Sequence, residues 1–212
     1  AFMSDNNGRN FQLFQFRNAA YRVHSNHQKL LLRKIRKLWN ELEQFIDHYP
    51  RFAEALGPVE GLPAHVPESV QRMVQASQHT GVGPMAAVAG TFAQLAAESG
   101  QAAGDDETIV ENGGDVYMYM QRPLSLGLWV GPHSPFRNLA FSIRPEDSPL
   151  AVCSSSSFLG HSKSFGKCDL VTVFSKNASI ADAEATACCN QIQTSGDLQK
   201  AVEAAVAVHE ID

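Results

Sequence analysis

Residues 181–190 read ADAEATACCN, a run of small side chains in which only Asp182 and Glu184 carry charge. Asp182 and Thr186 stand four residues apart. On a helix they would share one face, with Cβ atoms roughly 5–6 Å from each other. Small neighbours let a ligand or an adjacent sheet come close. The pattern therefore predicts a tightly packed helix that presents a carboxylate and a hydroxyl side by side.

Asp182 also has a purely structural interpretation. Ser179 precedes it by three residues, which is the spacing of a capping box with Asp in place of the usual Glu. A carboxylate in the first turn also interacts favourably with the helix dipole. The residues alone leave both roles open, ligand binding and helix capping.

The segment before this helix predicts two strands joined by a polar loop. LAVCSS (150–155) and DLVTVFS (169–175) are the strands, and the loop between them is rich in serine and contains His161. Such a loop offers hydroxyls, backbone N–H groups and one imidazole. Ser155 and Ser156 are candidate ligand contacts. His161 is the candidate acid or base, because the ordinary pKa of histidine, near 6.5, suits proton transfer at neutral pH.

ETIVENGGDVYMYMQRP, residues 107–123, predicts two strands at 108–110 and 116–119 around the turn ENGGD. Asn-Gly between apolar runs is a strong hairpin signal, and a hairpin alone would explain it. Two glycines in succession also let another molecule approach the backbone. We therefore treat Asn112, Gly113, Gly114 and Asp115 as candidate ligand contacts.

HTGVGPMAAVAGTFAQLAAESG, residues 79–100, predicts an Ala-rich helix that follows two glycines and closes at Gly100. A helix N-terminus with flexible backbone can hold an anion through its free N–H groups, which makes Gly83 a candidate contact. Junctions between glycine and a helix are common, so a plain structural role stays open.

Residues 27–50 predict an amphipathic helix. Its apolar positions recur at steps of three and four residues, and are expected to pack on the domain or on a second copy of the chain. The other face could bind a phosphate or a membrane surface, although a solvated face is the simpler interpretation. The apolar positions are Leu31, Ile35, Leu38, Leu42, Phe45 and Ile46, and the cations are Lys29, Arg33, Lys34, Arg36 and Lys37.

The composition predicts one domain over residues 1–212, with a short strand or two before residue 24. The net charge of −5 argues against nucleic acid as a partner, and no apolar run reaches the ~18 residues of a membrane span. The four cysteines show no zinc spacing and are expected to be buried free thiols of a cytoplasmic protein.

Three of these stretches together resemble the ApbE-type FAD:protein FMN transferase superfamily. VENGGDVYM is similar to its NxGGD segment and IADAEATA to its ADAxATA segment, while SSSSFLGHSKSFG stands in place of its TSG…His segment. Order and spacing agree over roughly residues 80–210. GVGPMAAVAG and VENGGD are most similar to an ApbE-like family of bacteria and archaea of unknown function.

The resemblance implies a T-fold-like α/β (α+β) domain, with a mixed sheet flanked by helices, plus an N-terminal helical segment. It further implies a flavin nucleotide, FAD or FMN, beside Mg²⁺. Asp182 and Thr186 match the metal ligands of the transferases, and Mg²⁺ prefers such hard oxygen ligands. The implied small-molecule site also includes the other candidates, which are Gly83, Asn112, Gly113, Gly114, Asp115, Ser155, Ser156 and His161.

The chain departs from the family motifs at two places. Ala89 stands where the transferases have Lys, and Gln94 stands near their Asp. The Asp-Pro of their HxxDPxxG segment is absent after His161. Three functions stay open: a module that binds a flavin nucleotide or related pyrophosphate with Mg²⁺, an active Mg²⁺-dependent FMN transferase or FAD pyrophosphatase, and a subunit for an unknown small ligand.

Overall fold

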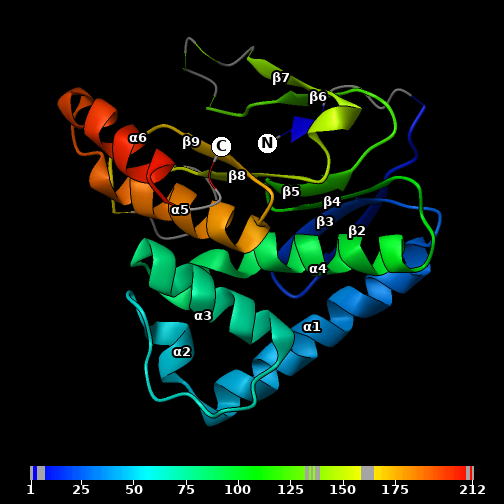
Figure 1. The fold of residues 1–212 in the computed structure, drawn as a ribbon, viewed down its shortest axis with the longest axis horizontal. Coiled ribbons are helices and arrows are strands. Elements are labelled where there is room, and N and C mark those ends of the chain that lie inside the picture. The colour runs from blue at the N-terminus through cyan, green and yellow to red at the C-terminus, as the bar shows by residue number, and fades with distance from the viewer. Residues whose placement is uncertain are drawn as a thin grey trace.

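A computed structural model describes residues 2–3, 8–131, 134, 136, 139–158, 165–208 and 211 of the chain. A six-stranded sheet lies in the middle of the molecule, with helices on one face and a small second sheet on the other (Figure 1). The mixture of helices and strands confirms the predicted fold class.

The main sheet has the order β2-β3-β4-β5-β8-β9, and every pairing in it is antiparallel. The prediction of a mixed sheet was therefore wrong. The reason lies in the long connection between β3 and β4. It leaves the C-terminal end of β3 and enters β4 at the same end of the sheet, so the two strands run in opposite directions. Asp105 shows this return, because it accepts hydrogen bonds from Ser25 and from the backbone N–H of Asn26. The strands are β2 (Gln12–Phe16), β3 (Ala19–His24), β4 (Thr108–Asn112), β5 (Asp115–Tyr119), β8 (Leu150–Ser155) and β9 (Val171–Ser175).

A second, three-stranded antiparallel sheet covers one face of the main sheet. It consists of β1 (Phe2–Met3), β6 (Leu124–Gly127) and β7 (Ala140–Ile143). Buried apolar side chains from both sheets form one cluster between them, including Ile109, Met118, Leu126 and Val152. Its burial stabilises this half of the molecule through the hydrophobic effect.

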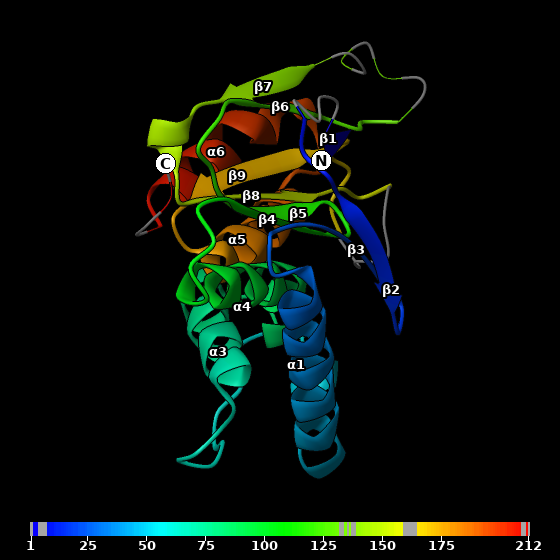
Figure 2. The same cartoon turned by 90° about the vertical axis from the view of Figure 1, so that its right-hand side faces the viewer.

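Helices α4 (Val88–Ala102) and α5 (Ala178–Gln191) cover the opposite face of the main sheet (Figures 1 and 2). The predicted tight packing of the small-residue helix is confirmed, because twelve of the fourteen residues of α5 are buried. The other helices of the described chain are α1 (Gln28–His48), α2 (Arg51–Glu54), α3 (Glu68–Thr80), α6 (Leu198–Val206) and the short 3₁₀ turns η1 (Pro84–Ala87), η2 (Pro145–Asp147) and η3 (Ser195–Asp197).

Several element predictions hold with shifted ends. The helix expected over 27–50 is α1, and its buried stripe includes five of the six predicted apolar positions, with Ile46 half-buried. The helix expected over 79–100 begins later, as η1 followed by α4, and continues past Gly100. All four cysteines are buried and free, as predicted. Within the described ranges, the helices are too short or too polar to cross a membrane.

Candidate functional site

Asp182 is held by the beginning of a neighbouring helix. Its Oδ2 accepts a hydrogen bond from the backbone N–H of Gly90, at 2.8 Å, in the first turn of α4. α4 has no side-chain cap from its own N-cap residue, so a carboxylate from α5 fills that role. The predicted capping box was wrong, because Asn177 caps α5 by accepting from the N–H groups of Ser179 and Ile180.

Gly90 allows α4 and α5 to touch at this point. A Cβ on residue 90 would lie 2.3 Å from the carbonyl oxygen of Ala178 and 2.9 Å from Cβ of Asp182. One turn further along α4, the Gln94 Oε1 accepts from the N–H of Ala178 at 2.8 Å. These contacts set the register of the two helices, and with it the position of the Asp182 carboxylate.

The β4–β5 turn brings Asp115 to the same place. Its central residues are Gly113 and Gly114, with φ of 63° and 110°, rather than the Asn-Gly pair that the sequence suggested. Asn112 donates from Nδ2 to the carbonyl oxygen of Ala89 at 3.1 Å, which ties the turn to the beginning of α4. Asp115 accepts from the N–H of Ser154 at 2.9 Å.

Two buried carboxyl groups and a thiol therefore interact in one small region. Burial raises the pKa of Asp115 to about 6. Burial first, and the charge of Asp115 second, raise the pKa of Asp182 well above its ordinary range. Burial and these two carboxylates also raise the pKa of the Cys153 thiol. Two negative charges this close in a buried site repel each other, so the arrangement favours a proton or a cation between them.

The serine segment 154–157, which comprises the end of β8 and the next two residues, runs alongside α5. Its start is fixed by the Ser154 bond to Asp115, and its end by a contact of 3.4 Å between Oγ of Ser157 and Sγ of Cys189. On α5, Asp182 and Cys189 are seven residues apart, roughly 10 Å along the axis. Three residues of extended chain cover a similar length of roughly 10 Å. This match in length indicates that Ser155 and Ser156 pass the part of α5 between Asp182 and Cys189, which includes Thr186.

Two hydroxyls in this region have no hydrogen-bond partner among the described residues. The Ser155 Oγ is fully buried without a partner. Thr186 is 7% exposed, and its hydroxyl makes no bond to the described chain. The unpaired, buried Ser155 hydroxyl, the Thr186 hydroxyl and the two carboxyl groups offer the oxygen ligands that a hard cation such as Mg²⁺ prefers. Within the described ranges, no three His, Cys, Asp or Glu side chains form a metal-binding group. A cation here would therefore also need hydroxyl, water or ligand oxygens.

The other candidate residues have different surroundings. Gly83 packs against the backbone after α2, where a Cβ would lie 1.8 Å from the carbonyl oxygen of Ala55. This packing accounts for a glycine at residue 83, and among the described residues no hydrogen bond joins Gly83 to Asp115 or Asp182. His161 lies outside the described residues.

Sequence reasoning missed Gly90 and Cys153 as parts of the site. A glycine inside an Ala-rich helix does signal a close approach, but it does not name the residue that approaches. Cys153 looked like an ordinary buried thiol, and the effect of the two carboxylates on its pKa depends on the β5–β8 pairing.

Comparison with known proteins places the chain in a family. The family model described as "AbpE bacteria" matches residues 19–210. The UPF0280 protein of Methanocella arvoryzae is 44% identical over 158 residues, which are 74% of this chain and 64% of that protein. The UPF0280 protein of Methanothrix thermoacetophila is 43% identical over 160 residues, 76% of this chain and 67% of that protein. The matched part thus spans about two thirds of the length of these relatives.

Solved structures show the same fold at low sequence identity. The flavin transferase ApbE from Vibrio cholerae superposes with a TM-score of 0.60 at 14% identity, covering 92% of this chain and 90% of that one. The Pseudomonas stutzeri flavinyl transferase ApbE, in its apo form, gives 0.55 at 14% identity, covering 90% and 87%. The chain belongs to the AbpE bacteria family and has the fold of the ApbE flavin transferases.

Proposed function

We propose that this protein binds Mg²⁺ together with a flavin nucleotide or a related pyrophosphate, at the site formed by Asp115, Asp182 and Thr186. The observation that supports it best is the pair of buried carboxyl groups, one from β5 and one from α5. Backbone N–H groups of Ser154 and Gly90 hold both in place. A fold without such a ligand would gain little from burying two repelling acids together.

Asp182, Thr186 and Asp115 are the residues that would hold the cation. When bound, Mg²⁺ neutralises charge on phosphate oxygens, and it usually keeps water and phosphate in its coordination shell. The hydroxyls of Ser155 and Thr186 can donate to phosphate oxygens. The N–H of Gly90 keeps Asp182 oriented.

Binding without flavin transfer is the activity that the residues favour. Ala89, in the position of the transferase lysine, has no side-chain functional group. Gln94, near the position of the transferase aspartate, uses its amide on Ala178 and Glu98. The second candidate is an FMN transferase or FAD pyrophosphatase, supported by the likeness to flavin transferases, with His161 as acid or base.

The test is a thermal shift of wild type and Asp182→Asn with FAD, FMN or ADP, each with and without Mg²⁺. Asn keeps an oxygen that accepts the N–H of Gly90, so the unliganded melting point should change little. It lacks the charge that a divalent cation needs. We expect Mg²⁺-dependent stabilisation of the wild type by at least one nucleotide, and its loss in the variant.

Asp106→Asn is the matched control, because Asp106 is exposed and lies before β4. It should keep the full shift. A wild type that no nucleotide stabilises in the presence of Mg²⁺ would refute the proposed site. Conversion of FAD to FMN or to a flavinylated protein in the same samples would support the second candidate.

A further inference from the structure

α1 carries a row of exposed cations, two of which have no acidic partner within the described chain. Residues 28–37 hold five basic and no acidic side chains, although the whole chain has a net charge of −5. Lys29, Arg33 and Arg36 follow each other at steps of four and three residues, so they lie on one side of the helix. All three are exposed. Within the described chain, Lys29 and Arg33 have no acidic partner, since the ion pairs of α1 involve Lys37, Glu41 and Glu43.

Strand β2 runs along this side of α1. Before the strand, the carbonyl oxygen of Asn10 accepts from Nε2 of Gln28 at 3.2 Å. In its middle, the Arg36 guanidinium lies over the ring of Phe14, 5.3 Å from its centre.

After β2, Arg17 pairs with Glu43 at 2.7 Å. Residues 28–43 of a helix and 10–17 of a strand both span about 22–23 Å, so the two elements stay side by side throughout. Figure 2 shows β2 beside the N-terminal half of α1.

The outer edge of β2 presents backbone groups for another strand. β2 is the last strand on its side of the main sheet. A two-residue turn follows the Phe16–Ala19 pair, so Gln12, Phe14 and Phe16 bond to β3. The N–H and C=O groups of Leu13 and Gln15 therefore point outward, and among the described residues no strand pairs with them. Such an edge is a template for strand addition.

We infer that this edge binds an extended acidic segment of a partner protein. The added segment would continue the main sheet, with its carboxylates toward Lys29, Arg33 and Arg36. A second copy of this chain is a poor partner for the β2 edge, because pairing two β2 edges would bring two rows of cations together. The outward N–H and C=O groups of β2 favour a peptide rather than a nucleic acid or a lipid surface. Only a peptide backbone can form a regular series of hydrogen bonds with them.

The geometry defines a probe. Residues directly opposite each other in an antiparallel pair point to the same face of the sheet. Peptide residues opposite Leu13 and Gln15 point away from α1 and donate to β2, and those opposite Phe14 point toward the cations. An octapeptide of alternating Glu and Val, labelled with fluorescein, therefore places Glu near α1 and Val opposite Leu13 and Gln15.

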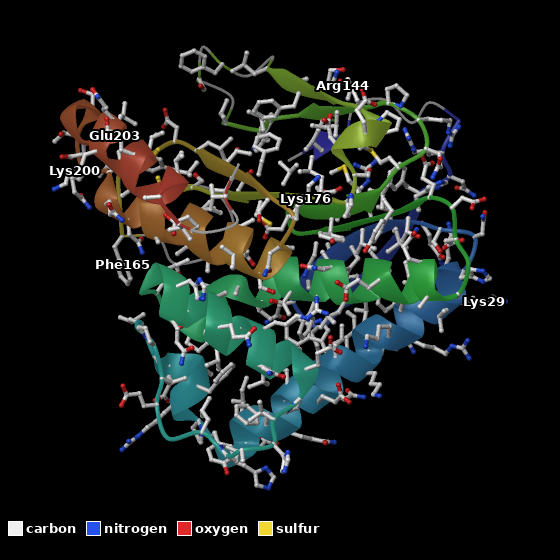
Figure 3. All side chains as sticks on the ribbon, viewed as in Figure 1. Lys29, Arg144, Phe165, Lys176, Lys200 and Glu203 are labelled. Atoms are coloured by element: carbon white, nitrogen blue, oxygen red, sulfur yellow. The ribbon has the colours of Figure 1, made fainter. Side chains whose placement is uncertain are left out.

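Fluorescence anisotropy with this peptide tests the charges. We expect binding that weakens as salt is raised, and that falls at least tenfold in the Lys29→Glu/Arg33→Glu double variant. Lys200→Glu is the matched control, because this exposed lysine lies on α6 at the opposite end of the molecule (Figure 3). It should change affinity less than twofold. An equal loss in the control would show a non-specific charge effect and overturn the inference.

A second set of probes tests the backbone ladder. N-methylation of the valines removes the donors that face β2 and should abolish binding, whereas N-methylation of the glutamates should leave it within about threefold. Amide hydrogen exchange at Leu13 and Gln15 should slow when the unmodified peptide is bound. Unchanged exchange, or equal binding of both methylated peptides, would refute strand addition.

Three further results would overturn the inference. No binding of the Glu-Val peptide at millimolar concentration overturns the inference. Tighter binding of single-stranded DNA or of phosphatidylserine vesicles than of the peptide overturns it in favour of another anion. A dimer that Gln15→Pro dissociates, in a folded variant, would show that a second copy occupies the edge instead.

Discussion

Gly90 is the residue on which the candidate site depends most directly. Its N–H positions the Asp182 carboxylate, and its missing side chain lets α5 come close enough to receive that bond. The motif around Asp182 made this aspartate visible from the sequence. Its partner was not visible, because Gly90 lies 92 residues away and the contact exists only once two helices cross.

Gly90→Ala should destabilise the protein by about 1–3 kcal/mol, because the new methyl group would overlap with the Ala178 carbonyl oxygen and force the helices apart. It should also weaken Mg²⁺-dependent nucleotide binding by moving Asp182. Urea unfolding and the thermal shift measure the two effects. Gly57→Ala is the control, since its Cβ would make only an ordinary contact of 3.8 Å, and it should be nearly neutral. Equal stability of both variants would contradict this account of the crossing.

At the scale of elements, the sequence predicted existence and type better than direction. The alternation around Asn-Gly-Gly-Asp predicted the β4–β5 hairpin, and the three- and four-residue steps predicted α1, because both patterns are local. The antiparallel direction of β4 against β3 could not be predicted, because it depends on the end of the strands at which the chain re-enters the sheet after the intervening helices. α5 is buried on almost all sides, so it has no polar face that periodicity could reveal.

Substitution of the two glycines in the β4–β5 turn should have different effects on stability. Gly113 has φ of 63°, which Asn adopts readily, whereas Gly114 has φ of 110°, which is strained for any side chain. Gly113→Asn should change the free energy of unfolding by less than about 0.5 kcal/mol, and Gly114→Asn should cost about 1–3 kcal/mol. Urea unfolding of the pair measures this. A reversed order would mean that the turn has another geometry.

At the scale of the whole molecule, Arg9 and Glu107 join parts that are far apart in the chain. The buried Arg9 guanidinium binds both carboxylate oxygens of Glu107, at 2.7 and 2.9 Å, and donates to the carbonyls of Arg122 and Pro123. This connects the N-terminal segment, the beginning of β4 and the connection into β6. Nothing local in the sequence marks this pair, whereas the family resemblance predicted the overall fold because it spans most of the chain.

This pair should give the protein a pH dependence in acid. Burial opposes the charged form of Glu107, but hydrogen bonds from Arg9, Arg122 and the Gln121 N–H outweigh it and hold its pKa at about 2. Its ordinary value is 4.5, so the native state binds fewer protons than the unfolded state. The stabilisation, about 3 kcal/mol at about 1.4 kcal/mol per pH unit, is complete above pH ~4.5 and is lost as the pH falls toward ~2.

Urea unfolding between pH 2 and 7 tests this assignment. Glu107→Gln should be less stable than wild type at pH 7, and the difference should shrink as the pH approaches 2. Glu203→Gln, on the exposed face of α6, should follow the wild type throughout. If the difference in stability between wild type and Glu107→Gln does not change with pH, the pair stabilises the protein through packing rather than through its charges.

The bond from Gly90 to Asp182 also bears on how the chain folds during its synthesis. Residues of α4 leave the ribosome long before α5 exists, so the first turn of α4 lacks its capping carboxylate until residue 182 emerges. At roughly 5–20 residues per second, the 92 residues between them take about 5–18 s to make. Asp115 follows Gly90 by 25 residues, so for the last 67 residues of that interval it is present without Asp182, and β4 and β5 lack their cover of α5. The candidate site is therefore assembled last, after the hairpin that supplies half of it.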